Sequence, residues 1–490
     1  MSTSDKRTQI GSLLLVLSIT FLVYSSVFSI PFLYYEEYGI TQNSTVMNPA
    51  AFIQRMMTLR GFFGRPISTL SYLIDFQLAG PSPAFFHLMN LLIHCGNVVL
   101  FYFLATRLPL KNVLLPTLFF ALHPLATACV SQIHGRPSSL STFFLLAGLL
   151  LFMRWKESER LNGKNLTILF GLFLLMVLSK QTTVFFPLLL LWFEFHTTGS
   201  AFLNRVRAQL RSKSGLAVSA LGLLIAVLLL RTYVWPNIGN AIVDPTTYSL
   251  SQFGNAFTLI KFYVLPFQTA LVHDLYFHAG LDLDVFVGLL IFSGLVLFSA
   301  RKRTTTSGFL LGAILISLFP TNSFIPKNEV IREWRLYPSL VFVCLLFGSF
   351  IDCSVETIRS KLSTPRFWTT LFYVTLVAYV SMEGYSVVRQ NRVYTDEIKV
   401  WEQVSEKYPY SSDAMSNIGV IYGRRGDYPK ALEYFLRAIQ LDGTNYTYYL
   451  NVAAAYWRLG DREQNELFSR RGQEIAARYN ERSHSFHLKR

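Results

Sequence analysis

Two adjacent carboxylates, Glu36 and Glu37, follow the first strongly apolar stretch of the chain and lie beside Tyr38. Carboxylates placed where a membrane helix reaches water could take a proton from a hydroxyl group as a general base, or hold a cation. We interpret the pair as a catalytic centre, with Glu36 as the base and Glu37 orienting the substrate or holding a cation. The alternative is a structural ion pair with a buried arginine.

Basic residues in the polar turns between apolar stretches are candidates for binding an anion such as phosphate. The candidates are Arg65, Lys180 and Arg335, followed by Arg136 and Arg332. Lys180 has an alternative interpretation, because an ordinary lysine at the end of a membrane helix extends its amine to the surface in the same way. Arg332 could instead pair with Glu333, which would leave Arg335 freer for an anion.

Histidine and amide side chains recur at helical spacing within one apolar stretch. Asn90 and His94 follow His87 by three and seven residues, so the three side chains share one face of a helix. A polar face inside a membrane either forms hydrogen bonds between helices or contacts a ligand. The two histidines are too far apart for a zinc-binding pair of the HExxH kind, and we predict no metal site.

The composition is that of a protein with many membrane spans. Of 490 residues, 52% are hydrophobic and only 15% are charged, and the mean hydropathy is +0.36, which is too apolar for a soluble protein of this length. About eleven stretches approach the roughly 20 apolar residues that cross a bilayer as a helix. They are residues 10–30, 83–106, 112–130, 138–153, 166–178, 182–195, 215–230, 283–300, 307–319, 336–351 and 367–385. The four cysteines fall in or beside these stretches, where core packing is expected and not a disulfide or metal site.

Lysine and arginine residues cluster in alternate short loops, and such loops stay on the cytoplasmic side. The basic loops are residues 6–7, 107–111, 154–164, 205–213, 301–303 and 359–366. They fall on one side only if the N-terminus is cytoplasmic, which places the Glu36 loop and the C-terminus outside. We expect residues 253–276 to be an interfacial or re-entrant segment and not a twelfth span. The net charge of +15 is scattered over these loops, which fits contact with anionic lipids and argues against nucleic-acid binding.

The last part of the chain is charged, helical in pattern and internally repeated. Tyr422 recurs as Tyr456 and Gly426 as Gly460, each 34 residues later, which is the period of tetratricopeptide repeats. We predict a membrane domain at residues 1–390 and about two and a half repeats at residues 394–480. Because about three repeats are needed for independent stability, we expect the second domain to be stabilised by contact with the first. It either binds an acceptor peptide or covers the outer face.

Several short motifs, in this order, resemble those of the transmembrane and tetratricopeptide repeat O-mannosyltransferases and their bacterial relatives, a family with the C-type glycosyltransferase fold. The resemblance covers nearly the whole chain. The similar elements are the acidic pair with Tyr38, the turn at residues 65–67, residues 87–94, residues 121–124, Gly135 with Arg136, the turn at residues 179–181 and residues 332–339. The chain departs from the family's usual acidic pair, Asp-Asp or Asp-Glu, by having Glu-Glu. It also has Gln181 in place of the usual acid and a different order of Arg332 and Glu333.

The resemblance implies an all-α bundle of membrane helices that transfers a sugar from a polyprenyl-phosphate donor to a hydroxyl acceptor, Ser or Thr of a protein, on the outer face of the membrane. Transfer without an enzyme-bound intermediate would invert the anomeric centre. The basic residues named above would hold the lipid phosphate. The substrate pocket would include Tyr38, His87, Asn90, His123 and His134. No cofactor is required by this chemistry, although a divalent cation could take part.

Two other functions are open from the sequence. A transporter or lipid flippase would also carry polar faces in its membrane helices, but internally repeated bundles are expected of it and none is convincing here. An inactive membrane scaffold with a repeat docking domain is supported by the Glu-Glu pair.

The outer side of the membrane is either a bacterial periplasm or the lumen of the endoplasmic reticulum. Two N-glycosylation sequons, at Asn43 and Asn445, would face outward, and the first lies within the proposed active loop. This favours the bacterial inner membrane, where such sites need not be modified, with the endoplasmic reticulum membrane as the alternative.

Overall fold

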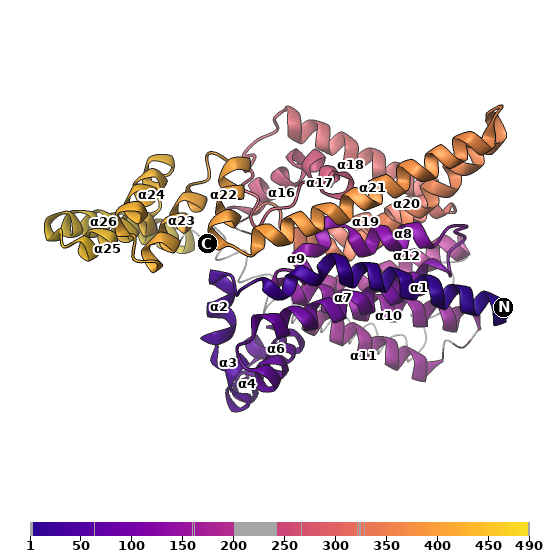
Figure 1. Cartoon of the computed structure of the whole chain (residues 1–490), viewed down its shortest axis with the longest axis horizontal. Coiled ribbons are helices and arrows are strands. Elements are labelled where there is room, and N and C mark those ends of the chain that lie inside the picture. The colour runs from indigo at the N-terminus through magenta and orange to yellow at the C-terminus, as the bar shows by residue number, and fades with distance from the viewer. Residues whose placement is uncertain are drawn as a thin grey trace. The chain divides into compact units, whose positions relative to one another are not determined.

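The computed structural model shows a chain of helices, with no strand among the residues that it describes (Figure 1). These are residues 3–62, 64–158, 160, 162–199, 243–265, 267–320, 322, 325–327 and 329–488. The chain divides into two compact units, one comprising Met1–Thr269 and Leu275–Arg392 and the other comprising Ala270–Asp274 and Val393–Arg490. The predicted all-α class is confirmed.

Six helices in the described part of the chain are long and apolar enough to cross a membrane. They are Gln9–Ser29, Pro83–Ala105, Ile133–Glu157, Leu283–Arg301, Glu333–Lys361 and Pro365–Tyr394. Two more apolar helices, Gly163–Ser179 and Thr306–Leu318, are shorter. These helices support the predicted membrane protein, but the number of eleven spans is not confirmed. The expected span at residues 215–230 and the basic loop at residues 205–213 lie outside the described residues.

Two apolar segments are interrupted where the sequence cannot continue a helix. Residues 112–130 form α8 (Leu114–Leu122), the short η2 (Pro124–Ala126) and α9 (Thr127–Val130), because Pro124 lacks the N–H group that would extend α8. In residues 253–276, the end of α16 (Pro245–Gly254) and α17 (Ala256–Val264) are followed by irregular chain. The described residues of this segment therefore form no single spanning helix.

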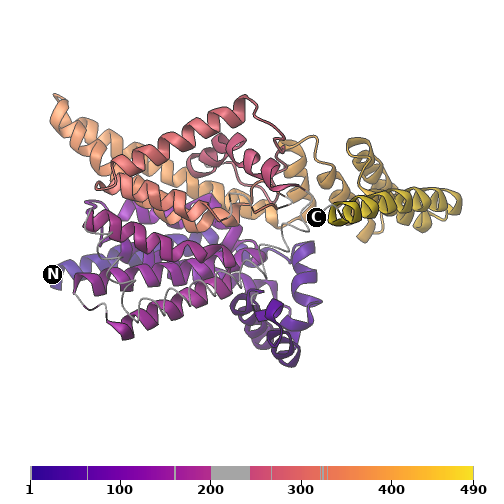
Figure 2. The same ribbon diagram turned by 180° about the vertical axis from the view of Figure 1, so that it is seen from behind.

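Several further helices of the first unit run alongside one another (Figure 2). They are α1 (Thr3–Tyr24), α7 (Pro83–Ala105), α10 (Arg136–Glu157), α11 (Gly163–Ser179), α12 (Phe186–Thr198), α18 (Leu283–Arg301), α19 (Thr306–Leu318), α20 (Glu333–Lys361) and α21 (Pro365–Tyr394). Helix α10 packs against α7, α11 and α20. It therefore lies at the centre of the unit, and its first residue, Arg136, is well placed to join several helices.

The segment between α1 and α7 forms a series of short helices that carries the acidic pair. After η1 (Ser25–Ser29) come α2 (Tyr34–Thr41), α3 (Ser44–Met47), α4 (Pro49–Met56), α5 (Leu59–Phe62) and α6 (Pro66–Ala79). The Asn43 side chain caps α3 by accepting a hydrogen bond from the Thr45 N–H at 3.1 Å. Arg65 precedes α6 with a φ of 66°, a left-handed conformation that is costly for a residue with a Cβ. Such strain persists only where surrounding contacts hold it.

The second unit contains the repeat helices. They are α22 (Glu397–Lys407), α23 (Ser412–Arg424), α24 (Tyr428–Leu441), α25 (Tyr446–Leu459) and α26 (Arg462–Leu488). Phe435 of α24 packs against Val452 and Ala455 of α25 in one buried core. Residues 270–274 belong to this unit, because the Tyr410 hydroxyl donates a hydrogen bond to the Asp274 carbonyl oxygen at 2.7 Å.

Gly419 provides a test of the repeat packing, because a Cβ added there would lie 2.6 Å from the Phe435 ring. Overpacking costs about 1–3 kcal/mol, whereas alanine in place of glycine inside a helix gains about 1 kcal/mol. We therefore expect Gly419→Ala to destabilise the repeat helices by about 1 kcal/mol. The measurement is the temperature at which proteolysis of the full-length protein begins, which should be lower in this variant. Gly423→Ala in the same helix is the control, since its Cβ would meet Ala431 at an ordinary 3.8 Å. Equal stability of the two variants would contradict the packing of α23 on α24.

Candidate functional site

Glu36 is fully buried in α2 and links this helix to a distant turn of the chain. Its Oε2 accepts a hydrogen bond from the Leu33 N–H at 3.3 Å, which caps α2, and its Oε1 accepts one from the His134 N–H at 3.3 Å. The two N–H donors fix the position of this carboxylate, as a general base requires. Glu37 and Tyr38 are also in α2, but their side chains lie outside the described structure.

The turn that meets Glu36, residues 131–135, leads from α9 to α10 and contains η3 (Ile133–Gly135). Gly135 is required here for space, because an added Cβ would lie 1.8 Å from the Ala128 carbonyl oxygen. The His134 ring packs against Gly39 of α2, where an added Cβ would lie 2.7 Å from the ring. The ring nitrogen Nδ1 of His134 is 4.0 Å from the Glu36 carboxylate. Gly39 therefore lets α2 approach the turn closely, and Gly135 lets the turn approach α9.

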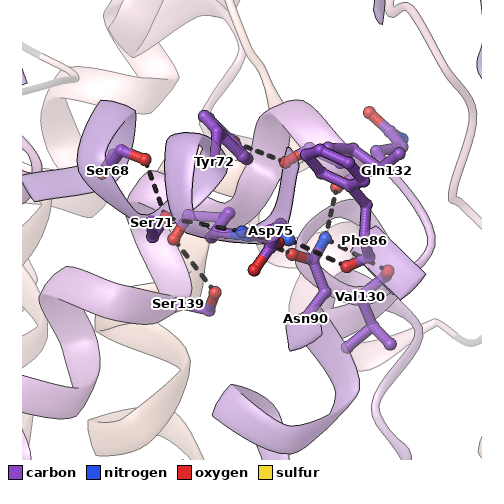
Figure 3. A network of polar contacts seen from close by, with 11 residues as sticks. Ser68, Ser71, Tyr72, Asp75, Phe86, Asn90, Val130, Gln132 and Ser139 are labelled. Carbon is purple, nitrogen blue, oxygen red and sulfur yellow. Dashed lines mark hydrogen bonds and ion pairs between the residues drawn. The ribbon is translucent and has the colours of Figure 1, made fainter. Parts of the chain in front are cut away.

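Arg136 begins α10 directly after this turn and is fully buried. Its guanidinium donates to the Asn90 side-chain oxygen at 2.6 Å and to the Phe86 carbonyl oxygen at 2.9 Å. It also forms an ion pair with Asp75 of α6, and Figure 3 shows Asp75 among the polar residues of this region. The guanidinium carbon lies 4.6 Å from the centre of the Tyr72 ring. The structure therefore places this predicted phosphate ligand in an internal ion pair.

Two of the predicted pocket residues, His87 and Asn90, contact the backbone of the same turn and the residue before it. The Asn90 amide donates to the Gln132 carbonyl oxygen at 3.3 Å, and His87 Nδ1 lies 3.4 Å from the Val130 carbonyl oxygen. We interpreted this polar helix face either as forming hydrogen bonds within the protein or as contacting a ligand. The contacts described here are hydrogen bonds within the protein.

His94 and His123 also have protein partners. His94 Nδ1 lies 2.6 Å from the Tyr337 hydroxyl of α20. His123 Nδ1 accepts a hydrogen bond from the Leu125 N–H at 3.2 Å and so caps η2. His94 therefore links α7 to α20, and His123 stabilises the start of η2.

Lys180 is buried at the end of α11, where it donates to the Trp334 carbonyl oxygen at 3.3 Å and contacts the Ser138 hydroxyl. Burial lowers the pKa of Lys180 well below its usual range, and the charges of Arg65 and Arg335 act in the same direction. Arg65 and Arg335 thus both lie within electrostatic range of Lys180. The fold brings together these three predicted phosphate ligands from distant parts of the sequence.

Arg65 lies within electrostatic range of both Lys180 and the turn that contacts Glu36. Its Nε donates a hydrogen bond to the Gln181 side-chain oxygen at 3.1 Å, directly beside Lys180. The charge of Arg65 also acts on His134, whose backbone holds Glu36. Gln181 stands where the resembled family has an acid, and as an amide it does not neutralise the charge of Arg65.

Glu329 is an ion-pair partner of both Arg332 and Arg335. Arg332 pairs with one Glu329 oxygen, and Arg335 Nη2 lies 3.3 Å from the other. Burial acts to raise the pKa of Glu329, but the hydrogen bond from Arg332 and the charges of both arginines outweigh it and lower the pKa. Arg335 is therefore shared between Glu329 and the group around Lys180.

Three residues of this region were not predicted: Tyr72, Asp75 and Glu329. The signal for the first two was a polar series, Ser68, Tyr72 and Asp75, at helical spacing in an otherwise apolar segment. For Glu329 it was an acid three and six residues before the two arginines. The described residues include no group of three or more His, Cys, Asp or Glu side chains that could hold a metal ion.

Comparisons with known proteins support the family resemblance. A family model described as tetratricopeptide repeat matches residues 412–445, which contain α23 and α24. The chain is 24% identical, over 82% of its length, to Protein O-mannosyl-transferase TMTC3 of Mus musculus, of which 47% is covered. It is 23% identical, over 88% of its length, to Protein O-mannosyl-transferase F38B6.6 of Caenorhabditis elegans, of which 63% is covered.

The same level of similarity, 23% identity over 82% of the chain, is found with Protein O-mannosyl-transferase TMTC3 of Homo sapiens. The chain thus spans about half to less than two thirds of the length of these relatives. The resemblance to the tetratricopeptide repeat O-mannosyltransferases, drawn from the motifs, is confirmed. No solved structure matches the chain.

Proposed function

We propose that the protein is an integral membrane glycosyltransferase that transfers a sugar from a polyprenyl-phosphate donor to a serine or threonine hydroxyl of a protein, on the outer face of the membrane. Two observations carry the proposal: the buried Glu36 carboxylate accepts a hydrogen bond from the His134 N–H, and Arg65 lies within electrostatic range of both His134 and Lys180. A base for the acceptor and positive charge for a leaving phosphate are what this transfer needs. The names of the relatives support the same activity and favour mannose as the sugar.

In the proposed reaction the acceptor oxygen attacks the anomeric carbon of the sugar while the bond from that carbon to the phosphate oxygen breaks. Glu36 takes the hydroxyl proton, and the polyprenyl phosphate leaves with the electron pair of the broken bond. Arg65, Lys180 and Arg335 stabilise the negative charge on the departing phosphate. A single displacement of this kind inverts the anomeric centre. Glu37 is assigned to orienting the substrate or holding a divalent cation.

The other predicted site residues receive supporting roles in this proposal. Arg136, His87 and Asn90 hold the turn at residues 131–135, because their contacts are with protein groups. Arg332 forms an ion pair with Glu329. Tyr38 stays a candidate for the substrate pocket, beside the acidic pair.

The membrane domain, residues 1–390, is proposed to carry out the transfer and the repeat domain, residues 394–480, to bind the protein acceptor. Tetratricopeptide helices form extended surfaces that suit a peptide, which favours this role over a mere cover for the outer face. The three relatives that match most of the chain's length are animal proteins, and this favours the endoplasmic reticulum membrane, with the lumen as the outer side, over the bacterial inner membrane.

The proposal is tested with the full-length protein in lipid nanodiscs, a radiolabelled polyprenyl-phosphate mannose and a serine- and threonine-containing peptide. We expect label on a peptide hydroxyl, with the anomeric configuration opposite to that of the donor. Movement of labelled lipid across a vesicle bilayer without transfer would instead support the flippase. Neither activity, over a panel of donors and acceptors, would support the inactive scaffold.

Removing one cation from the group around Lys180 should weaken donor binding. We expect Arg65→Gln and Lys180→Met each to raise the KM for the donor at least about tenfold, since a hydrogen bond to a charged group contributes about 1.5–3 kcal/mol. Lys164→Met is the matched control, because Lys164 is exposed at the opposite end of the same helix, α11. An unchanged donor KM in both Arg65→Gln and Lys180→Met would contradict the proposal that these residues bind the donor phosphate.

A further inference from the structure

Helix α6 carries polar side chains on its inner face and apolar side chains on its outer face. Leu70, Ile74 and Leu78 recur every fourth residue and are exposed, whereas Ser68 and Asp75 are buried. The burial of these two polar side chains fixes the rotation of the helix about its axis. The polar side chains of α6 are thereby directed into the protein.

The first contact from α6 to the turn at residues 131–135 is made by Tyr72. Its hydroxyl donates a hydrogen bond to the Ile133 carbonyl oxygen at 2.7 Å. The Ile133 carbonyl precedes the His134 N–H in the same peptide unit. A phenol on α6 therefore holds the peptide group that donates to Glu36.

The second contact passes through the buried ion pair. Asp75 pairs with Arg136, which directly follows the turn, and Arg136 donates to the Asn90 side-chain oxygen at 2.6 Å. The amide of Asn90 donates in turn to the Gln132 carbonyl oxygen at 3.3 Å. The turn is thus held at both ends by side chains that are themselves fixed by α6.

The hydrogen bond at the end of this network is sensitive to position. The His134 N–H lies 3.3 Å from Glu36 Oε1, which is slightly longer than the usual range for such bonds. A small displacement of the turn would therefore break it. A buried ion pair adds little stability compared with well-packed apolar residues, so stability alone is a weak reason for this network.

We propose that Tyr72, Asp75 and Arg136 are positioning residues that set the turn at residues 131–135 and, through it, the Glu36 carboxylate. The inference rests on the proposed role of Glu36 as the base. The network acts on the orientation of Glu36 and leaves the cations around Lys180 in place. Its loss should therefore lower kcat and leave the donor KM unchanged.

The test compares Tyr72→Phe with Tyr379→Phe in the full-length protein. Both variants lose one phenol hydroxyl that donates to a backbone carbonyl, but Tyr379 donates to Val264 at 2.6 Å, away from the turn. Phenylalanine keeps the ring that Arg136 contacts. We expect Tyr72→Phe to speed hydrogen–deuterium exchange of the His134 and Gly135 amides and to lower kcat, each about fivefold, the equivalent of one hydrogen bond. Tyr379→Phe should change neither.

The possible outcomes separate this inference from the proposed function. Unchanged exchange in Tyr72→Phe would overturn the inference, and so would faster exchange with a wild-type kcat, since the network would then be structural only. A raised donor KM at constant kcat would also overturn it. If the wild-type protein transfers no sugar, the proposed function fails, and the exchange data still decide whether Tyr72 holds the turn. Asp75→Asn should speed the exchange of the same amides and lower kcat more strongly. If Asp75→Asn does not fold, Tyr72→Phe alone still tests the inference.

Discussion

Glu36→Gln is expected to lower the rate of sugar transfer by about 10²–10⁴-fold, the range that a general base contributes. The amide has nearly the shape of the carboxylate but cannot take the proton of the acceptor hydroxyl. It has one acceptor oxygen, whereas the carboxylate accepts from both the Leu33 and His134 N–H groups, so one of these hydrogen bonds is also lost. The measurement is the rate at saturating donor and acceptor, with the protein in nanodiscs.

Thermal unfolding of the same samples separates lost chemistry from lost structure. One hydrogen bond is worth about 1 kcal/mol, so Glu36→Gln should stay folded at the assay temperature. Glu37→Gln, one residue further along α2, is the matched comparison. If Glu36→Gln transferred sugar at the wild-type rate while Glu37→Gln did not, the base would be Glu37. Wild-type rates in both variants would remove the acidic pair from the mechanism.

Arg136→Ala is expected to destabilise the first unit by about 3–5 kcal/mol, the cost of breaking a buried ion pair from one side. The change leaves the Asp75 carboxylate buried without its counter-charge, and it removes the donors to Asn90 and to the Phe86 carbonyl oxygen. Thermal unfolding in detergent, followed by loss of solubility or by circular dichroism, measures the effect.

Two further variants show whether burial is the cause. Lys111→Ala also breaks an ion pair, with Glu356, but those side chains are 74% and 73% exposed, so the expected loss is at most about 1 kcal/mol. Replacing Asp75 with leucine and Arg136 with methionine together should recover most of the stability, because no charge is then left unpaired. An Arg136→Ala variant as stable as Lys111→Ala would contradict the buried pair.

Local sequence patterns were sufficient to predict the all-α fold class and the presence of tetratricopeptide repeat helices. Long apolar helices follow from composition, and the recurrence of Tyr422 as Tyr456 indicates helices that pack on a neighbouring repeat. The number of spans could not be obtained in the same way. The apolar stretch around His123 and Pro124 has the composition of a span, yet it breaks into α8, η2 and α9. Hydropathy measures how apolar a stretch is, whereas helix continuity depends on backbone hydrogen bonds that proline cannot make.

The candidate site depended on contacts between distant residues. Glu36 and His134 are 98 residues apart in the chain, and Asp75 and Arg136 are 61 residues apart. The sequence marked the acidic pair and the basic turns as the parts that could do chemistry, because charged residues are rare in so apolar a chain.

The same tripeptide, Gly-Arg-Pro, occurs twice in those turns, with Arg65 in one copy and Arg136 in the other. By residue type and local spacing the two arginines are equivalent. In the folded protein Arg136 is buried against the carboxylate of Asp75, whereas Arg65 contacts the neutral amide of Gln181 beside Lys180. The sequence by itself thus determined which side chains carry charge, and only the tertiary structure decided which of those charges is neutralised inside the protein. The physical reason is that the cost and the effect of a charge are set by the groups packed around it, and these come from elsewhere in the chain.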